Sequence, residues 1–228
     1  MSGARVSIPV NGREIAGYLA SPNVGAPAPG VIVLQEWWGL VPHIEQLCDR
    51  FASEGFVALA PDLYHGEIAK SPDEAGKLLM ALDIAETEKD LRSATAFLLS
   101  QPAVTGDKAG VVGFCMGGQL ALLAAASNPG IGACVDFYGV HPNVAIDLER
   151  MTCPVLGLFA EHDGPATLQM ARRLEELGGK GQRFEAVVYP GAKHAFFNDT
   201  RPSVYDPSAA ADAWRRVLEF LRDHLARA

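Results

Sequence analysis

Short runs of apolar residues alternate with longer segments of helical periodicity over most of this chain. The run at 31–34 is continuous, as expected of a strand buried on both faces of a sheet. Further strands are expected at 56–60, 109–112, 132–138, 155–160 and 183–189. Segments with helical spacing of apolar residues lie at 42–54, 85–101, 119–126, 167–177 and 206–225, and a further helix is expected to begin at Ser71-Pro72. This alternation predicts an α/β protein with a largely parallel central sheet and helices on both faces.

The N-terminal part has a different pattern. Residues 5–20 alternate weakly in polarity around Asn11-Gly12, a dipeptide that favours a tight hairpin turn. We therefore expect two antiparallel strands at about 5–10 and 13–20. The segment 21–30 is rich in proline and glycine and is expected to be a loop that is too short for a domain linker. The length of 228 residues fits a single domain over 1–228.

Composition and charge narrow the classes of protein and partner. Apolar residues make up 49% and charged residues 20% of the chain, as in soluble globular proteins. The net charge of −8, without a long run of either sign, argues against nucleic acid or an anionic membrane as a partner. We find no apolar stretch that could span a bilayer and no signal core at the N-terminus. The four cysteines have no metal-type spacing, so we expect free thiols, no metal site and a cytoplasmic location.

A glycine-rich turn around Cys115 is the strongest chemical signal. The segment Gly113-Phe-Cys115-Met-Gly117-Gly118 lies between a predicted strand and a predicted helix. The pattern Gly-x-nucleophile-x-Gly marks the tight turn that raises the nucleophile above the sheet of an α/β-hydrolase, here with cysteine in place of serine. The N-terminus of the following helix favours a thiolate at Cys115. The alternative is a buried structural cysteine in an ordinary strand-turn-helix unit, and the motif alone leaves both open.

Other reactive groups also follow predicted strands. Glu36, Cys115, Asp163 and His194 each come one to a few residues after an apolar run, so one edge of the sheet is expected to collect them. The last three occur in the order nucleophile, acid, base, which is the order of α/β-hydrolases. Two alternatives remain at this point: Asp163 could cap the helix that begins near residue 165, and Glu36 could be a loop carboxylate on the surface.

His194 is the preferred base among six histidines because it lies in a turn directly after the last strand. The other five are less suitable: His43 and His224 lie in helices where we expect solvent exposure, His65 and His141 lie on loops that could line a pocket, and His162 cannot easily bond its neighbour Asp163 while it serves Cys115.

Five segments taken together resemble the dienelactone hydrolases. They are Gln35-Glu36-x-x-Gly39, Pro61-Asp62-Leu63-Tyr64, Gly113-Phe-Cys115-Met-Gly117-Gly118, Tyr138-Gly139 and Gly191-Ala-Lys-His194-x-Phe196. Each motif is weak by itself, but the ordered set is specific and the resemblance covers about 5–225. It implies an α/β-hydrolase fold, a small-molecule lactone or ester as substrate, and no cofactor.

The resemblance also implies roles for individual residues. Cys115, Asp163 and His194 would form a catalytic triad. Glu36 would approach the resting thiol and help to deprotonate it once substrate displaces the carboxylate. The backbone amides at two further positions would form the oxyanion hole, namely those of Trp37 and Met116.

The chain departs from the resemblance where substrate would bind. Dienelactone hydrolases hold the carboxylate of their substrate with two arginines. Here no arginine lies between Arg50 and Arg92, and the position four residues after His194 is Asn198, with Arg201 the nearest arginine. Loss of a charged partner costs binding of a desolvated carboxylate, so another substrate is expected. Aromatic residues are expected to line the pocket instead: Trp37, Trp38, Tyr64 and His65.

The sequence thus favours acyl transfer to sulfur. Cys115 would attack a lactone or ester carbonyl, and His194 would then activate water to hydrolyse the thioester. Two alternatives stay open: a general carboxylesterase acting on activated esters, and a redox-responsive or ligand-binding relative without turnover. We expect a monomer or a small homo-oligomer.

Overall fold

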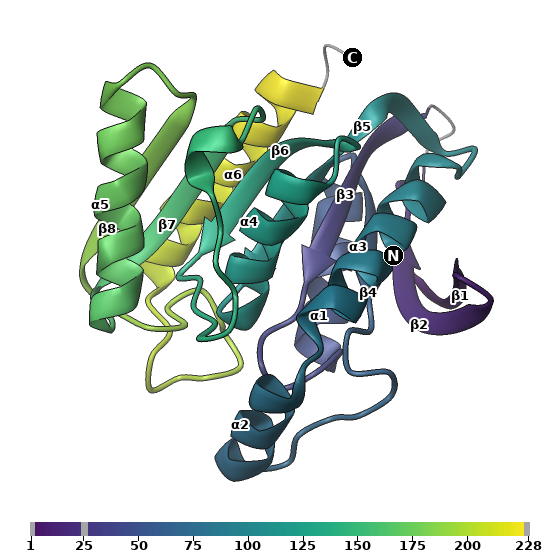
Figure 1. The fold of residues 1–228 in the computed structure, drawn as a ribbon, viewed down its shortest axis with the longest axis horizontal. Helices are drawn as coiled ribbons and strands as arrows, with labels where there is room; N and C mark the ends of the chain where they lie inside the picture. The colour runs from purple at the N-terminus through teal and green to yellow at the C-terminus, as the bar shows by residue number, and fades with distance from the viewer. Residues whose placement is uncertain (1–2, 24–26, 226–228) are drawn as a thin grey trace.

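A sheet of eight strands runs through the part of the chain that the computed structural model describes, residues 3–23 and 27–225 (Figure 1). The strand order is β1-β2-β4-β3-β5-β6-β7-β8. The strands are β1 (Ala4–Val10), β2 (Arg13–Ala20), β3 (Ala28–Leu34), β4 (Val57–Pro61), β5 (Val104–Phe114), β6 (Ile131–Phe137), β7 (Val155–His162) and β8 (Phe184–Lys193). The hairpin β1-β2 and the pair β2-β4 are antiparallel, and the other neighbours are parallel, which confirms the predicted sheet and hairpin.

Helices cover both faces of this sheet, as predicted. They are α1 (Pro42–Ser53), α2 (Pro72–Ala81), α3 (Ile84–Leu99), α4 (Met116–Ser127), α5 (Pro165–Gly179) and α6 (Pro207–Leu225), with a short 3₁₀ turn, η1 (Leu148–Arg150). One hydrophobic cluster joins the sheet to α1 and α6, and a second joins the other face to α3, α4 and α5. Figure 1 shows α4 and α5 on the face of the sheet opposite α6.

Local sequence explains where individual helices begin and which side they bury. The Ser71 side chain accepts a hydrogen bond from the amide of Glu74, and Pro72 follows it as the first residue of α2. Helix α1 turns Ile44 and Phe51 into the core, as the spacing of its apolar residues predicts.

Two expectations about local structure were wrong. Residues 28–30 were expected to lie in a loop but belong to β3, because Ala28 pairs with Val104 in a β5 that begins earlier than its apolar run. Residues 24–26 of that predicted loop lie outside the described residues. His43 was expected to be exposed, but α1 packs its side chain inward, where 6% is exposed and Nδ1 lies 3.5 Å from Oδ1 of Asp199.

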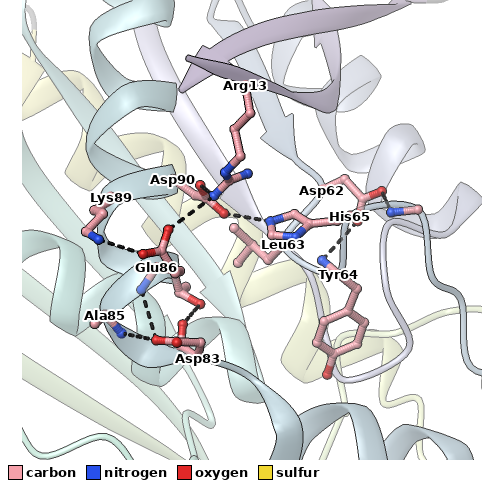
Figure 2. A network of polar contacts seen from close by, with 12 residues as sticks. Arg13, Asp62, Leu63, Tyr64, His65, Asp83, Ala85, Glu86, Lys89 and Asp90 are labelled. Atoms are coloured by element: carbon pink, nitrogen blue, oxygen red, sulfur yellow. Dashed lines mark hydrogen bonds and ion pairs between the residues drawn. The ribbon is translucent and has the colours of Figure 1, made fainter. Parts of the chain in front are cut away.

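A buried carboxylate ties the N-terminal hairpin to the helical layer. Asp90 of α3 has 1% of its side chain exposed and accepts a hydrogen bond from Arg13, the first residue of β2. Its other oxygen lies 2.7 Å from Nε2 of His65, in the loop after β4 (Figure 2). Because three segments distant in sequence meet at one carboxylate, Asp90 is expected to stabilise the fold more than an exposed charge does.

Replacing Asp90 tests this tie. We expect Asp90→Ala to lower the free energy of unfolding by about 2 kcal/mol, because two donors lose a buried acceptor while water reaches their half-exposed side chains. Glu88→Ala is the matched control on the same helix, since it breaks an exposed pair with Arg92 and should change the free energy by less than about 0.5 kcal/mol. Urea denaturation of both variants measures the difference, and equal losses would contradict the role of Asp90.

Candidate active site

Cys115 lies in a strained turn between β5 and α4. Its backbone has φ 55° and ψ −118°, a conformation that residues other than glycine rarely adopt. The chain passes itself closely here: a Cβ on Gly113 would lie 1.8 Å from the carbonyl oxygen of Gly117, and a Cβ on Gly117 would lie 2.5 Å from that of Gln35. The glycines on both sides of Cys115 are therefore needed for the turn that presents its half-buried side chain.

The register of β7 and β8 brings Asp163 and His194 together. His162 pairs with Lys193 at the ends of these parallel strands, so the two following residues lie side by side. Nδ1 of His194 lies 2.9 Å from Oδ2 and 3.1 Å from Oδ1 of Asp163. Asp163 is not the N-cap of α5, which is Gly164, although its Oδ1 also accepts a hydrogen bond of 2.7 Å from the Gly164 amide.

His194 and Cys115 line the same cavity, and the sulfur also affects the charge of the imidazole. Burial lowers the pKa of His194, but its hydrogen bonds to Asp163 and to Cys115 outweigh burial and raise the pKa to about 10. The Tyr138 ring packs against the imidazole at 5.0 Å between ring centroids. The arrangement therefore favours a protonated imidazole between a carboxylate and a sulfur, which is the partner that a nucleophilic thiolate requires.

Glu36 lies two residues beyond the end of β3 and has 2% of its surface exposed. Its Oε2 accepts a hydrogen bond of 2.7 Å from Nδ2 of Asn198. Burial raises the pKa of Glu36, whereas Asn198, Arg201 and His194 act to lower it. The carboxylate is thus a buried group and not a loop carboxylate on the surface, and its hydrogen bond goes to Asn198 rather than to the Cys115 thiol.

A cavity of about 260 Å³ joins these groups. Its walls come from β-strand ends, from α2 and from the loop after β6, and they comprise Glu36, Trp37, Leu79, Cys115, Val140, Pro142, His194 and Arg201. Cys115, His194 and Glu36 therefore line one cavity that has mostly apolar walls.

The residues expected to form an oxyanion hole are next to this cavity. Trp37 lies in the turn after β3 and lines the cavity, and Met116 is the first residue of α4. Among the described turn and helix-end hydrogen bonds, none is donated by the backbone amide of Trp37 or Met116. Both amides thus remain candidates for binding a developing negative charge.

The chain matches the model of the dienelactone hydrolase family over residues 15–225. It is 39% identical to "Protein usf" of Aquifex pyrophilus and 34% identical to a "Putative carboxymethylenebutenolidase" of Aquifex aeolicus, in each case over 98% of this chain and 99% of the relative. The crystal structure of a "Putative Dienelactone Hydrolase" from Klebsiella pneumoniae superposes with a TM-score of 0.86 at 31% identity, covering 97% of this chain and 98% of the other.

The chain belongs to the dienelactone hydrolase family. This membership confirms the predicted family, the α/β-hydrolase fold and the predicted class of enzyme, a hydrolase of esters or lactones.

Within this family member, three residues expected to bind substrate do not line the cavity. Tyr64 packs behind it, where its hydroxyl donates to Sδ of Met116 at 3.1 Å. Trp38 contacts the edge of Trp37 and accepts a backbone hydrogen bond from Ala69. His65 turns toward Asp90 and lines a separate cavity beside α2 and α3 (Figure 2).

The sequence reasoning missed other cavity residues. Val140 and Pro142 follow the Tyr138-Gly139 motif directly, so their place after a strand end was a usable signal. Leu79 carried no signal, because an apolar residue of an amphipathic helix is normally packed in the core. Arg201, named only as the nearest arginine in the sequence, lines the cavity.

The described residues contain no group of three or more His, Cys, Asp or Glu side chains that could hold a metal ion. None of the described helices combines the length and the apolar character needed to cross a membrane.

A second buried acid lies under the nucleophile turn. Asp136, in β6, is fully buried, and a Cβ on either Gly118 or Gly139 would come within 2.3 Å of its Oδ1. No described side chain donates a hydrogen bond to either oxygen of Asp136. Burial raises the pKa of Asp136 to about 7, the Gly139 amide lowers it and nearby Asp163 raises it further.

This raised pKa predicts a pH-dependent stability. Between the unfolded pKa of about 3.9 and the folded pKa of about 7, the folded state binds the extra proton, so stability falls as pH rises through this window. Asp136→Asn removes the effect, and we expect its advantage over the wild type to grow by on the order of 2–4 kcal/mol from pH 4 to pH 8. Urea denaturation at both pH values measures the free energy of unfolding of the variant and of the wild type. The contributions of other titrating groups are common to both proteins and cancel in the difference. A difference independent of pH would show that Asp136 titrates normally.

Proposed function

We propose that this protein hydrolyses a small lactone or carboxylic ester through an acyl thioester on Cys115. The observation that carries the proposal is the pairing of the His194 imidazole with the Asp163 carboxylate at the wall of a cavity that Cys115 also lines. A nucleophile, a base and a group that orients the base are together the requirements of nucleophilic acyl transfer.

The reaction has two halves. In the first, the Cys115 thiol gives its proton to the Glu36 carboxylate, the sulfur attacks the carbonyl carbon, and the amides of Trp37 and Met116 bind the developing oxyanion. The C–O bond of the ester then breaks, and the imidazolium of His194 protonates the leaving oxygen. In the second half, His194 takes a proton from water and the hydroxide attacks the thioester. The C–S bond then breaks, the acid leaves, and the Cys115 thiolate takes back the proton held by Glu36.

The cavity bears on the substrate. A volume of about 260 Å³ suits a small molecule, and the apolar side chains of Leu79, Val140 and Pro142 suit an uncharged acyl or alcohol part. This wall also favours the second candidate, a general carboxylesterase acting on activated esters. None of the steps above requires a cofactor.

A redox-responsive relative without turnover is less well supported. A disulfide switch needs a second thiol within reach of Cys115, and the three other cysteines, Cys48, Cys134 and Cys153, are buried in the hydrophobic clusters or against them. All four are free thiols, and a cytoplasmic location remains a prediction.

Variants of the three central residues test the proposed function. We expect Cys115→Ala and His194→Ala each to lower kcat/KM for a nitrophenyl ester at least about a thousandfold, and Asp163→Asn somewhat less. Cys115→Ser should retain a small residual rate. Because triad members act as a unit, the losses in the double variant Cys115→Ala/His194→Ala should not add.

Cys153→Ala is the matched control, since it removes a buried thiol that does not line the cavity. It should keep near wild-type kcat/KM. Undiminished hydrolysis by a folded Cys115→Ala protein would rule out the thioester mechanism.

A further inference from the structure

The hydrogen bond between Glu36 and Asn198 joins two buried side chains that are 162 residues apart in sequence. Glu36 is 2% exposed and Asn198 is 3% exposed, and Nδ2 of the amide lies 2.7 Å from Oε2 of the carboxylate. A buried carboxylate without a donor is costly, so this contact contributes strongly to where Glu36 lies. Asn198 is also the position where the family resemblance led us to expect an arginine.

The surroundings of Asn198 fix which end of its amide faces Glu36. Oδ1 accepts hydrogen bonds from the backbone amide of Thr200 at 3.0 Å and from its hydroxyl at 2.6 Å. A backbone N–H can only donate, so the atom facing Thr200 must be the carbonyl oxygen and the NH₂ group must face Glu36. The backbone of Asn198 is held as well, by hydrogen bonds to Ala195 and from Arg201. The donor is therefore rigidly placed.

Glu36 is anchored through one oxygen only. Oε2 bonds to Asn198, whereas no hydrogen bond from another described residue reaches Oε1, and the residue lines the cavity that Cys115 also lines. The charged and titratable groups near Glu36 are Cys115, His194 and Arg201, which line the same cavity, and Tyr138. None of them shares a described hydrogen bond or ion pair with it, so the neutral amide is the only described hydrogen-bond donor that orients the carboxylate.

We propose that Asn198 is a positioning residue that anchors Oε2 of Glu36 and leaves Oε1 free to take the proton of the Cys115 thiol. This inference rests on the proposed function. In the step it assists, the S–H bond breaks, an O–H bond forms at Oε1, and the electron pair stays on sulfur to attack the carbonyl. The leaving oxygen is protonated by the imidazolium of His194, as above, and Glu36 returns its proton to the Cys115 sulfur when the product leaves.

A neutral anchor has a consequence for specificity. An arginine at this position could release Glu36 and form an ion pair with an anionic group of the substrate instead. An amide pairs only weakly with such a group. Asn198 therefore holds Glu36 in place whether the ester is neutral or anionic, and its loss should slow the acylation by both kinds of ester equally.

Two substitutions at this position separate positioning from packing. Asn198→Leu keeps the approximate volume and removes the donor, so we expect the acylation rate with nitrophenyl acetate to fall at least about tenfold at all pH values, with KM little changed. In Asn198→Asp the two carboxyl groups share one proton at low pH and repel each other at higher pH. Acylation should then stay near the wild-type rate at pH 5 and fall at least about tenfold below it at pH 8.

Asn128→Asp is the matched control. Asn128 is a buried asparagine at the end of α4 whose Oδ1 accepts from the Gly130 amide, and its NH₂ group has no partner among the described residues. The change keeps the acceptor and should leave the pH profile of acylation parallel to the wild type.

Stopped-flow acylation with nitrophenyl acetate and with the anionic ester mono-nitrophenyl succinate measures these rates from pH 5 to pH 8, and near-ultraviolet circular dichroism checks folding. A near wild-type rate of Asn198→Asp at pH 5 shows that this variant is folded. The test therefore holds even if Asn198→Leu does not fold. A profile of Asn198→Asp parallel to the wild type, or a wild-type rate in Asn198→Leu, would overturn the proposal.

The same measurement, applied also to Cys115→Ala and Glu36→Gln, separates this inference from the proposed function. If Cys115→Ala still hydrolyses the ester, the thioester mechanism fails, and this inference fails with it. If Cys115→Ala is inactive and Glu36→Gln acylates slowly while both Asn198 variants behave as wild type, only the positioning role fails.

Discussion

The turn between β5 and α4 fixes Cys115, and the other groups of the site are placed with respect to it. Its strained backbone is held from both sides: the Cys115 amide donates to Phe137 at 3.0 Å, and its carbonyl accepts from the amides of Gly118 at 3.0 Å and Val140 at 3.2 Å. Strain of this kind persists only where the surroundings over-determine the conformation. Here the end of β6 and the first turn of α4 do so together.

The parallel register of the sheet then supplies the partners of Cys115. Strands β7 and β8 end at the same level of the sheet, where His162 pairs with Lys193. Asp163 and His194, the next residues on each strand, therefore lie side by side. Further backbone strain lies beside them, with φ of 42° at Tyr138, which packs on the imidazole, and 65° at Ala195, directly after His194. Strained residues commonly gather where a site needs side chains held in one orientation.

Much of this fold could be predicted from the sequence, because the relevant signals are local. Apolar runs, helical spacing and the Asn11-Gly12 turn report structure within a few residues, and groups at strand ends must share an edge of a parallel sheet. The predictions that were wrong or incomplete concern contacts between segments that are distant in the sequence. No periodicity in the sequence connects the residues of three such contacts. These are the contacts of His43 with Asp199, of His65 with Asp90 and of Glu36 with Asn198.

The substrate wall was the least predictable part for the same reason. Leu79 and Arg201 reach the cavity from α2 and from the loop before α6, and their spacing in the sequence gives no indication that they face the same space. The predicted aromatic pocket assumed that aromatic residues close to strand ends in the sequence also line the cavity. In the structure, the backbone directs some of these side chains away from it.

The most direct test of the account is to trap the acyl group. Wild-type protein is mixed with excess nitrophenyl ester, quenched in acid within milliseconds and analysed by intact mass and peptide mapping. If Cys115 is the nucleophile, the protein gains the mass of one acyl group on the peptide that contains Cys115. Hydroxylamine removes this group, and Cys115→Ala does not acquire it. Rapid turnover accompanied by an acyl group on any other residue would contradict this role of Cys115.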